Sequence, residues 1–397
     1  MSEKSSADGG KHGGIGELAA YFLKLGTLGF GGPVALVGQM ERELVQERGW
    51  LSGSEMRDVI AVSQTMPGPL AIQVGILVSY MRRGFWGAWV GGACFILPNF
   101  LIVTALAAAY VSLGGLSWMQ AVFYGVSPVV IALILHSCWR LTKIGMEHWL
   151  QWGIAAVCFV LTVVLRAEIA VLFIVAGLIG LAWYGNLLRG GRATDGSALA
   201  FLPWLTQGLN ASGDSSQLLQ ILWFFLKAGS LTFGSGLVIV PFLENGVVQE
   251  SGWLNEHQFL VPVAIGMISP GPVVITATFV GYLVQGFLGA LAATVGIFLP
   301  SFIMVLVIGP LLLRHRGNAN VQGFVKGAYA AAIGTIAGAS VLLGRIAIGD
   351  WLTAAIAILS LLALFRWKIP NPALMAVAAV IGLIAFPLLQ PSWVYVQ

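Results

Sequence analysis

Charged residues are scarce in this sequence. Asp, Glu, Lys and Arg make up 9% of its 397 residues, whereas 58% of the residues are hydrophobic. Soluble domains contain about 25% charged residues, and so few charged side chains cannot cover the surface of a soluble chain of this length. The composition therefore excludes a soluble globular protein and indicates one that spans a membrane.

Motifs for catalysis or metal binding are also missing. The three cysteines, Cys94, Cys138 and Cys158, stand singly within apolar runs, which predicts buried free thiols rather than a redox or metal motif. There is no HExxH, no Walker loop and no paired acidic metal motif. We therefore predict no enzyme activity and no cofactor, and transport, if that is the function, would use an existing gradient. The formal charge of +4 is small and does not indicate a nucleic-acid partner.

Long apolar runs dominate from Phe85 to the C-terminus. A helix needs about 20 apolar residues to cross a bilayer, and the runs are continuous rather than alternating as in barrel strands. We predict an all-α polytopic membrane protein. The expected organisation is a disordered tail at 1–14, a first repeat at 15–188, a linker at 189–217 and a second repeat at 218–397. Each repeat contains about six apolar segments.

An internal duplication organises the chain. Residues 22–69 align without a gap to residues 225–272 at an offset of 203, and 19 of the 48 aligned positions are identical. The identities include the pairs Lys24/Lys227, Trp50/Trp253 and Pro67/Pro270. Apolar composition produces chance matches at small aliphatic positions, but not at lysine, tryptophan and proline together. The chain is thus two homologous halves.

The loop charges of the two halves are swapped. Arg82 and Arg83 precede the third segment of the first half, and the loop after it, 112–117, is uncharged. In the second half residues 284–286 are uncharged, whereas Arg314 and Arg316 follow the segment. Because Lys and Arg mark cytoplasmic loops, we predict inverted-topology repeats. Six full crossings per half would contradict this, unless the linker crosses once or one segment is a hairpin.

Two breaks interrupt the apolar segments of each half. They are Phe-Gly-Gly-Pro and Pro-Gly-Pro in the first half, and Phe-Gly-Ser-Gly and Pro-Gly-Pro in the second. Proline inside a helix removes a hydrogen bond and clashes with the preceding turn, so broken helices are expected at both motifs. The N-terminal end of the second half-helix attracts anions. A plain kink and close helix packing are the alternatives; two matched breaks favour a binding site.

Charged and hydroxyl side chains near the breaks complete the candidate sites. Lys24 and Lys227 lie within apolar segments, where lysine is costly and often functional, although both, like Lys326, can also reach an interface. The candidate substrate-binding residues are Lys24, Gly31, Gly32, Ser63, Gln64, Pro67, Gly68, Pro69, Lys227, Gly234, Ser235, Ser269, Pro270, Gly271, Pro272 and Thr276. Candidates for gating or coupling are Glu41, Arg42, Glu244, Arg82 and Arg83, with a solvated surface helix as the alternative for residues 38–58. For Asn99 we expect an interhelical hydrogen bond.

The stretch GFGGPVALVGQMERELVQERGWL, followed by Pro-Gly-Pro, resembles the chromate ion transporter family in its long, two-domain form. The resemblance covers essentially the whole chain, and the second half contributes LTFGSG, ESGWL and SPGP. It implies export of chromate across the bacterial inner membrane and chromate resistance. Because chromate is a dianion, we expect the membrane potential or a proton or other ion gradient to drive its export. A transporter of sulfate or another oxyanion is the main alternative; an intramembrane enzyme or a channel is a further one. Sulfate would then compete with chromate, and a homodimer is compatible with the sequence.

Overall fold

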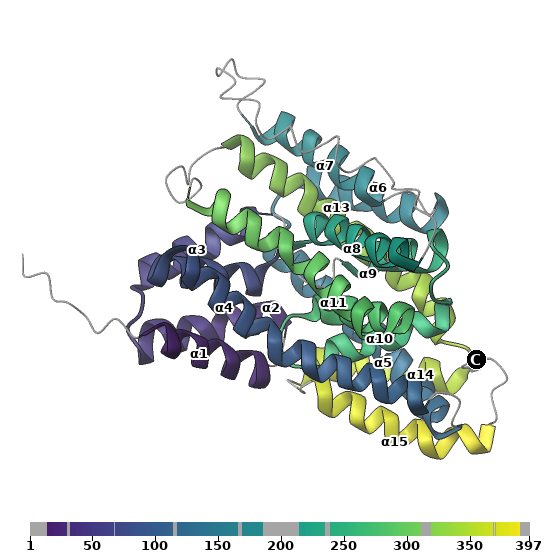
Figure 1. Ribbon diagram of the computed structural model, residues 1–397. Helices are drawn as coiled ribbons and strands as arrows, with labels where there is room; N and C mark the ends of the chain where they lie inside the picture. The colour runs from purple at the N-terminus through teal and green to yellow at the C-terminus, as the bar shows by residue number, and fades with distance from the viewer. Residues whose placement is uncertain are drawn as a thin grey trace, which may run out of the picture.

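The computed structural model describes residues 14–29, 32–66, 68–113, 117–165, 169–185, 214–234, 239–310, 319–367, 369 and 371–389 (Figure 1). Almost all of the predicted N-terminal tail and of the predicted linker lies outside these residues. The first half contains α1 (Ile15–Leu28), α2 (Gly32–Glu41), η1 (Arg42–Glu47), α3 (Gly53–Thr65), β1 (Gly68–Pro69), α4 (Leu70–Leu113), α5 (Ser117–Gly145), α6 (Trp149–Val160), η2 (Leu161–Leu165) and α7 (Ile169–Tyr184). The second contains α8 (Asp214–Leu231), β2 (Phe233–Gly234), α9 (Ile239–Leu243), η7 (Glu244–Glu250), α10 (Glu256–Ile268), η8 (Val273–Ile275), α11 (Thr276–Val307), α13 (Ala319–Ala347), α14 (Trp351–Arg366) and α15 (Asn371–Leu389).

The first apolar segment folds as a helical hairpin. The chain runs along α1 and returns through α2 and the π-helical turn η1, so that residues 48–50 lie beside the first turns of α1. There Arg48 Nη1 lies 3.1 Å from Glu17 Oε1, and the rings of Trp50 and Tyr21 are 5.5 Å apart. With 14 residues, α1 is about 21 Å long, which is shorter than the roughly 30 Å hydrocarbon core of a bilayer.

A second hairpin follows. α3 begins at a capping box in which the Ser52 hydroxyl accepts from the Glu55 N–H and the Glu55 carboxylate accepts from the Ser52 N–H. After the break at β1 the chain returns along the first part of α4, and Arg82 Nη1 donates to the Trp50 carbonyl oxygen at 3.2 Å. Both hairpins therefore have their base around Trp50, and their turns lie at the other end.

α4 contains a reversal of direction rather than one continuous helix. Arg83 and Gly84 have non-helical backbone angles, and Gly84 has a φ of 62°. A Cβ atom placed on Gly87 would lie 2.5 Å from the Ser79 carbonyl oxygen, although eight residues of continuous helix separate two positions by about 12 Å. The arm before Gly84 thus completes the second hairpin, and the outer arm after it runs back antiparallel.

The second half repeats this geometry. Gly286 has a φ of 57° inside α11, and the hydroxyl oxygens of Thr278 and Thr294 are 2.6 Å apart across its two arms. The rings of Phe224 and Trp253, which correspond to Tyr21 and Trp50, are 5.6 Å apart. The duplication in the sequence is therefore a duplication of structure.

Corresponding helices of the two halves lie side by side and run antiparallel. Along α5 and α13, the Cys138 thiol donates to the Ile333 carbonyl oxygen at 3.6 Å, and the Tyr329 hydroxyl donates to the Leu141 carbonyl oxygen at 3.0 Å. From the first contact to the second, the residue number rises on α5 and falls on α13. This is the pattern of an antiparallel pair.

The outer arms of α4 and α11 show the same relation. Trp89 stacks on Phe302 with ring centroids 4.6 Å apart, and Phe100 meets Phe287 at 6.0 Å. The beginning of each arm therefore lies beside the later part of the other. Two independent pairs of corresponding helices have this arrangement.

The last helices of each half pack on the opposite half. α6 and α7 lie along α13, where Gly180 fits against the Gly323 carbonyl oxygen. α14 and α15 lie along α5, where Gly125 fits against the Ala378 carbonyl oxygen. In Figure 1 these two helix pairs form opposite edges of the molecule. We call α6/α7 and α14/α15 the exchanged pairs.

Among the described residues, five helical spans are long and apolar enough to cross a membrane: Leu70–Leu113, Ala121–Lys143, Val273–Val307, Gln322–Ala347 and Asn371–Leu389. The first and third of these reverse direction at Gly84 and Gly286. The all-helical membrane architecture predicted from the sequence is confirmed, apart from two strands of two residues each. Large apolar side chains cover the outside, and Trp149 and Trp351, at corresponding positions, are 71% and 72% exposed. Such tryptophans are typical of membrane–water interfaces.

Candidate substrate site

The hairpin turns of the two halves meet each other. The Gly68 N–H donates to the Thr232 carbonyl oxygen, and the Gly271 N–H donates to the Gly29 carbonyl oxygen at 2.7 Å. These two hydrogen bonds correspond, because Gly68 and Gly271, like Gly29 and Thr232, differ by 203 in number. β1 and β2 also pair in parallel, with Gly68 opposite Phe233. Each Pro-Gly-Pro turn is thus joined to the glycine-rich turn of the other half.

Glycine is required at the centre of both Pro-Gly-Pro turns. Gly68 has a φ of 134° and Gly271 a φ of 85°, values that L side chains rarely adopt. A Cβ atom on Gly68 would also lie 2.7 Å from Ser301 Oγ, and one on Gly271 would lie 2.9 Å from Asn99 Nδ2. The absence of a side chain therefore brings each turn close to a polar group of the other half.

Three buried polar side chains around the turns make no hydrogen bond within the described part of the chain. Asn99 and Ser301 are 0% exposed and Ser63 is 1% exposed, and neither polar atom of Asn99 nor the hydroxyl of Ser301 or Ser63 has a partner. A buried polar group without a partner costs about 1–3 kcal/mol. Such groups, gathered where two halves meet, are suited to binding a polar ligand.

Asn99 and Ser301 correct the prediction from the sequence. We expected Asn99 to form an interhelical hydrogen bond, but its amide has no partner and lies at Gly271 instead. Ser301 was not among the predicted candidates. The signal was present in the sequence, because each residue directly follows one of the matched prolines, Pro98 and Pro300.

The two candidate lysines lie on the helices that lead to the glycine-rich turns. Lys24 is exposed on α1, and Lys227 is half-buried on α8. Four residues, or about 6 Å of helix, separate Lys24 from the end of α1. Neither lysine forms an ion pair with another described residue.

The remaining substrate-binding candidates fall into three groups. The hydroxyls of Ser269 and Thr276 donate to backbone carbonyl oxygens of their own segment, those of Gly266 at 3.4 Å and Val273 at 2.9 Å. Pro69, Gly234, Pro270 and Pro272 form or adjoin the paired turns, whereas Gly32 opens α2 and Gln64 lies in α3. Gly31, Pro67 and Ser235 lie outside the described residues.

The gating candidates do not lie at the turns. Glu41 is exposed, and Arg42 Nε pairs with Glu47 Oε1 at 3.5 Å on the surface. Glu244 is buried and accepts from Gln249 Nε2 at 3.1 Å. Arg82 and Arg83 lie at the hairpin base beside Trp50 and Gly84. Any role of these residues in gating is exerted away from the paired turns.

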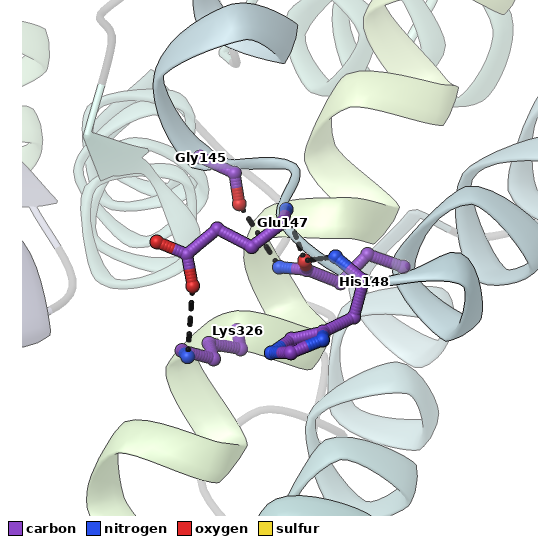
Figure 2. A network of polar contacts seen from close by, with 5 residues as sticks. Gly145, Glu147, His148 and Lys326 are labelled. Atoms are coloured by element: carbon purple, nitrogen blue, oxygen red, sulfur yellow. Dashed lines mark hydrogen bonds and ion pairs between the residues drawn. The ribbon is translucent and has the colours of Figure 1, made fainter.

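A polar network at one end of the molecule joins the halves (Figure 2). Lys326 Nζ of α13 lies 3.1 Å from Glu147 Oε2. Behind this ion pair, Gln151 Oε1 accepts from the N–H groups of Glu147 and His148, and Gln151 Nε2 donates to the Gly145 carbonyl oxygen. Lys326 thus forms an ion pair with the exposed Glu147 and is not isolated in the apolar interior.

A corresponding contact joins the halves at the other end. Tyr124, which corresponds to Lys326, donates its hydroxyl to Asp350 Oδ2 at 2.6 Å. Burial raises the pKa of the Asp350 carboxyl, but the hydrogen bonds from Thr353, Leu352 and Tyr124 outweigh it, so the net pKa lies below the ordinary value. Asp350 is therefore ionised at neutral pH.

Among the described residues, no group of three or more His, Cys, Asp and Glu side chains is placed to hold a metal ion. The fold and the paired turns define a multi-pass membrane protein made of two homologous, interlocked halves, with unpartnered polar side chains where the turns of the two halves meet.

The sequence profile of the family described as "Chromate transporter" matches twice, at residues 16–181 and 219–383. The chain belongs to the chromate transporter family, and it is a transporter rather than an enzyme. It is 44% identical over 380 residues to the "Chromate transport protein" of Cupriavidus metallidurans, covering 94% of each chain. It is 43% identical over 375 residues to the "Probable chromate transport protein" of Synechococcus elongatus, covering 93% of this chain and 95% of the relative. No solved structure matches the chain significantly.

Proposed function

We propose that the protein exports chromate across the bacterial inner membrane and binds the dianion where the paired turns of the two halves meet. The observation that carries this proposal is the reciprocal pairing of the Pro-Gly-Pro and glycine-rich turns, with unpartnered polar side chains beside them. The two relatives described above are named as transporters of chromate. Together these features give the ion a site to which both halves contribute.

The two halves are inverted repeats with helices broken at the four turns. The antiparallel pairing of α5 with α13 supports this, since repeats related by an axis along the membrane normal would place corresponding helices parallel. The arms of each hairpin are shorter than a bilayer, and the turns of the two halves meet. Hairpins that enter from opposite membrane faces and end near the middle have both properties. Four crossings per half then remain, which is still an even number, so the hairpins alone do not resolve the conflict raised by six full crossings per half.

The basic residues give the orientation. If the outer arm of α4 and α5 each cross the membrane, the bases of the first hairpins and the end of α5 lie on one side. Basic residues of the described part on that side are Arg42, Arg48, Arg57, Arg82, Arg83, Arg140, Lys143, Lys326 and Arg366. Arg345 lies on the other side. Because Lys and Arg mark the cytoplasmic side, the first half opens from the cytoplasm.

Positive charge and helix ends favour an anion at the turns. The first part of α4 and the segment of η8 and α11 both begin at a Pro-Gly-Pro turn, so their N-terminal N–H groups and positive dipole ends face the site. A lysine without an ion-pair partner near the middle of a membrane is costly unless it faces water. Lys24 and Lys227 therefore line aqueous approaches, where their charge attracts the dianion.

Export is the direction that the membrane potential favours. Moving two negative charges out of a negative-inside cell releases about 4.6 kcal/mol per 100 mV, so the potential alone can drive efflux. Everted membrane vesicles containing the protein should accumulate chromate when an inside-positive potential is imposed. Accumulation that persists unchanged after an ionophore collapses the potential would contradict this coupling, and competition by sulfate would measure specificity for chromate.

A further inference from the structure

Asn99 and Ser301 hold corresponding positions in the two halves and face opposite turns. Each follows a proline in an outer arm, Pro98 in α4 and Pro300 in α11. Asn99 of the first half lies at Gly271 of the second, and Ser301 of the second half lies at Gly68 of the first. Each Pro-Gly-Pro turn therefore has a polar side chain from the other half beside it.

Neither side chain has a structural task that accounts for its polarity. Several buried hydroxyls in the membrane helices donate to their own backbone; the Ser340 hydroxyl, for example, donates to the Ile336 carbonyl oxygen at 2.7 Å. Ser301 is as deeply buried, at 0% exposed, yet its hydroxyl has no partner. Asn99 leaves both its donor and its acceptor unpaired at the same burial.

We propose that Asn99 and Ser301 are the side-chain ligands that select the transported oxyanion, one at each Pro-Gly-Pro turn. This inference rests on the proposed function. The Asn99 amide donates two N–H bonds to anion oxygens, and its carbonyl oxygen accepts from a water that accompanies the ion. Ser301 donates one O–H bond. The half-site at Gly271 thus offers more donors than the half-site at Gly68, and it binds the anion more tightly.

The test measures chromate transport in vesicles by Asn99→Asp, Asn99→Ala and Ser301→Ala, with Ser340→Ala as the matched control. Asn99→Asp preserves size but places a carboxylate against a dianion, so it should raise the KM for chromate most, by well over tenfold. Asn99→Ala should raise it about tenfold, as expected for losing hydrogen bonds to a charged group, and Ser301→Ala by less. Ser340→Ala should match the wild type.

Two further readouts separate a ligand from a structural role. Chromate should raise the unfolding temperature of the purified wild type and of Ser340→Ala, but not that of Asn99→Asp. The ratio of chromate to sulfate transport should also change in the Asn99 variants. If the wild type transports chromate while all variants keep its KM and its chromate-dependent stabilisation, Asn99 and Ser301 are not ligands and the proposed function stands. If the wild type itself moves no chromate, the proposed function fails instead.

Discussion

At the scale of single residues, the two central glycines of the Pro-Gly-Pro turns combine an unusual φ with close contacts. Gly68→Ala would force a φ of 134° on a residue with a Cβ atom and press that atom against Gln73 and Ser301. We expect this variant to insert in the membrane but to lose chromate transport. Vesicle uptake normalised to the amount of inserted protein measures it.

Gly84→Ala is the matched control for Gly68→Ala. Gly84 also has a positive φ, 62°, but open space surrounds the position of a Cβ atom. Only backbone strain of about 1–2 kcal/mol is expected, with transport retained. Equal loss of transport in both variants would show that the loss is caused by the positive φ alone, and not by the close contacts at the paired turns.

Asp350 makes the stability of the protein depend on pH. Its folded-state pKa lies below the ordinary value of 3.8, so the stability it contributes is present above that value and is lost as the pH falls below about 4. Asp350→Asn keeps a residue that can cap α14 but removes the charge. We expect its unfolding temperature in detergent to be below that of the wild type at pH 7, and the difference to shrink as the pH falls below 4. A difference that stays constant with pH would exclude an ionised Asp350 as its source.

At the scale of helices, the exchanged pairs depend on glycine contacts between the halves. A Cβ atom on Gly327 of α13 would overlap the Ala176 carbonyl oxygen of α7. Gly327→Ala should therefore cost about 1–3 kcal/mol, as overpacked sites do, and lower the unfolding temperature. In Gly153→Ala of α6 the added atom meets nothing within 4 Å, so that variant should be neutral or stabilising by up to about 1 kcal/mol.

The helices themselves were largely predictable from the sequence, but their pairing was not. Apolar runs and the position of Arg82 and Arg83 located the segments, because helix formation in a membrane is dictated by local composition. The boundary predicted at Arg82 and Arg83 between the second and third segments coincides with the reversal at Gly84. The exchange of α6/α7 onto α13 depends on contacts between residues more than 100 positions apart, which no local pattern records.

At the scale of the whole molecule, opposite membrane faces are expected for the bases of the two sets of hairpins. Residues 48 and 250 are both exposed, and they lie at these bases. With the native cysteines replaced, Arg48→Cys should react with a membrane-impermeant thiol reagent from the cytoplasm, and Glu250→Cys from the periplasm. Labelling of both from the same side would contradict the inversion.

The candidate site was predictable in part. Identity between the halves pointed to the turns, because matched prolines and glycines survive where backbone conformation demands them. The sequence could not show that each turn is paired with the other half, and it therefore suggested hydroxyls near the breaks, such as Ser269 and Thr276, which bond to their own backbone. That Asn99 and Ser301 lack hydrogen-bond partners is evident only from the structure. The domain boundaries and the individual site residues stay predictions.

The exchanged pairs also have a consequence in time. α6 and α7 belong to the first half, yet the surface they cover, α13, ends at Ala347. Ribosomes add about 5–20 residues per second, so roughly 8–30 s separate the synthesis of α7 from that of its partner. During this interval the faces of α6 and α7 that pack on α13 are not yet covered by it. Completion of the fold of the first half is therefore coupled to translation of the second half.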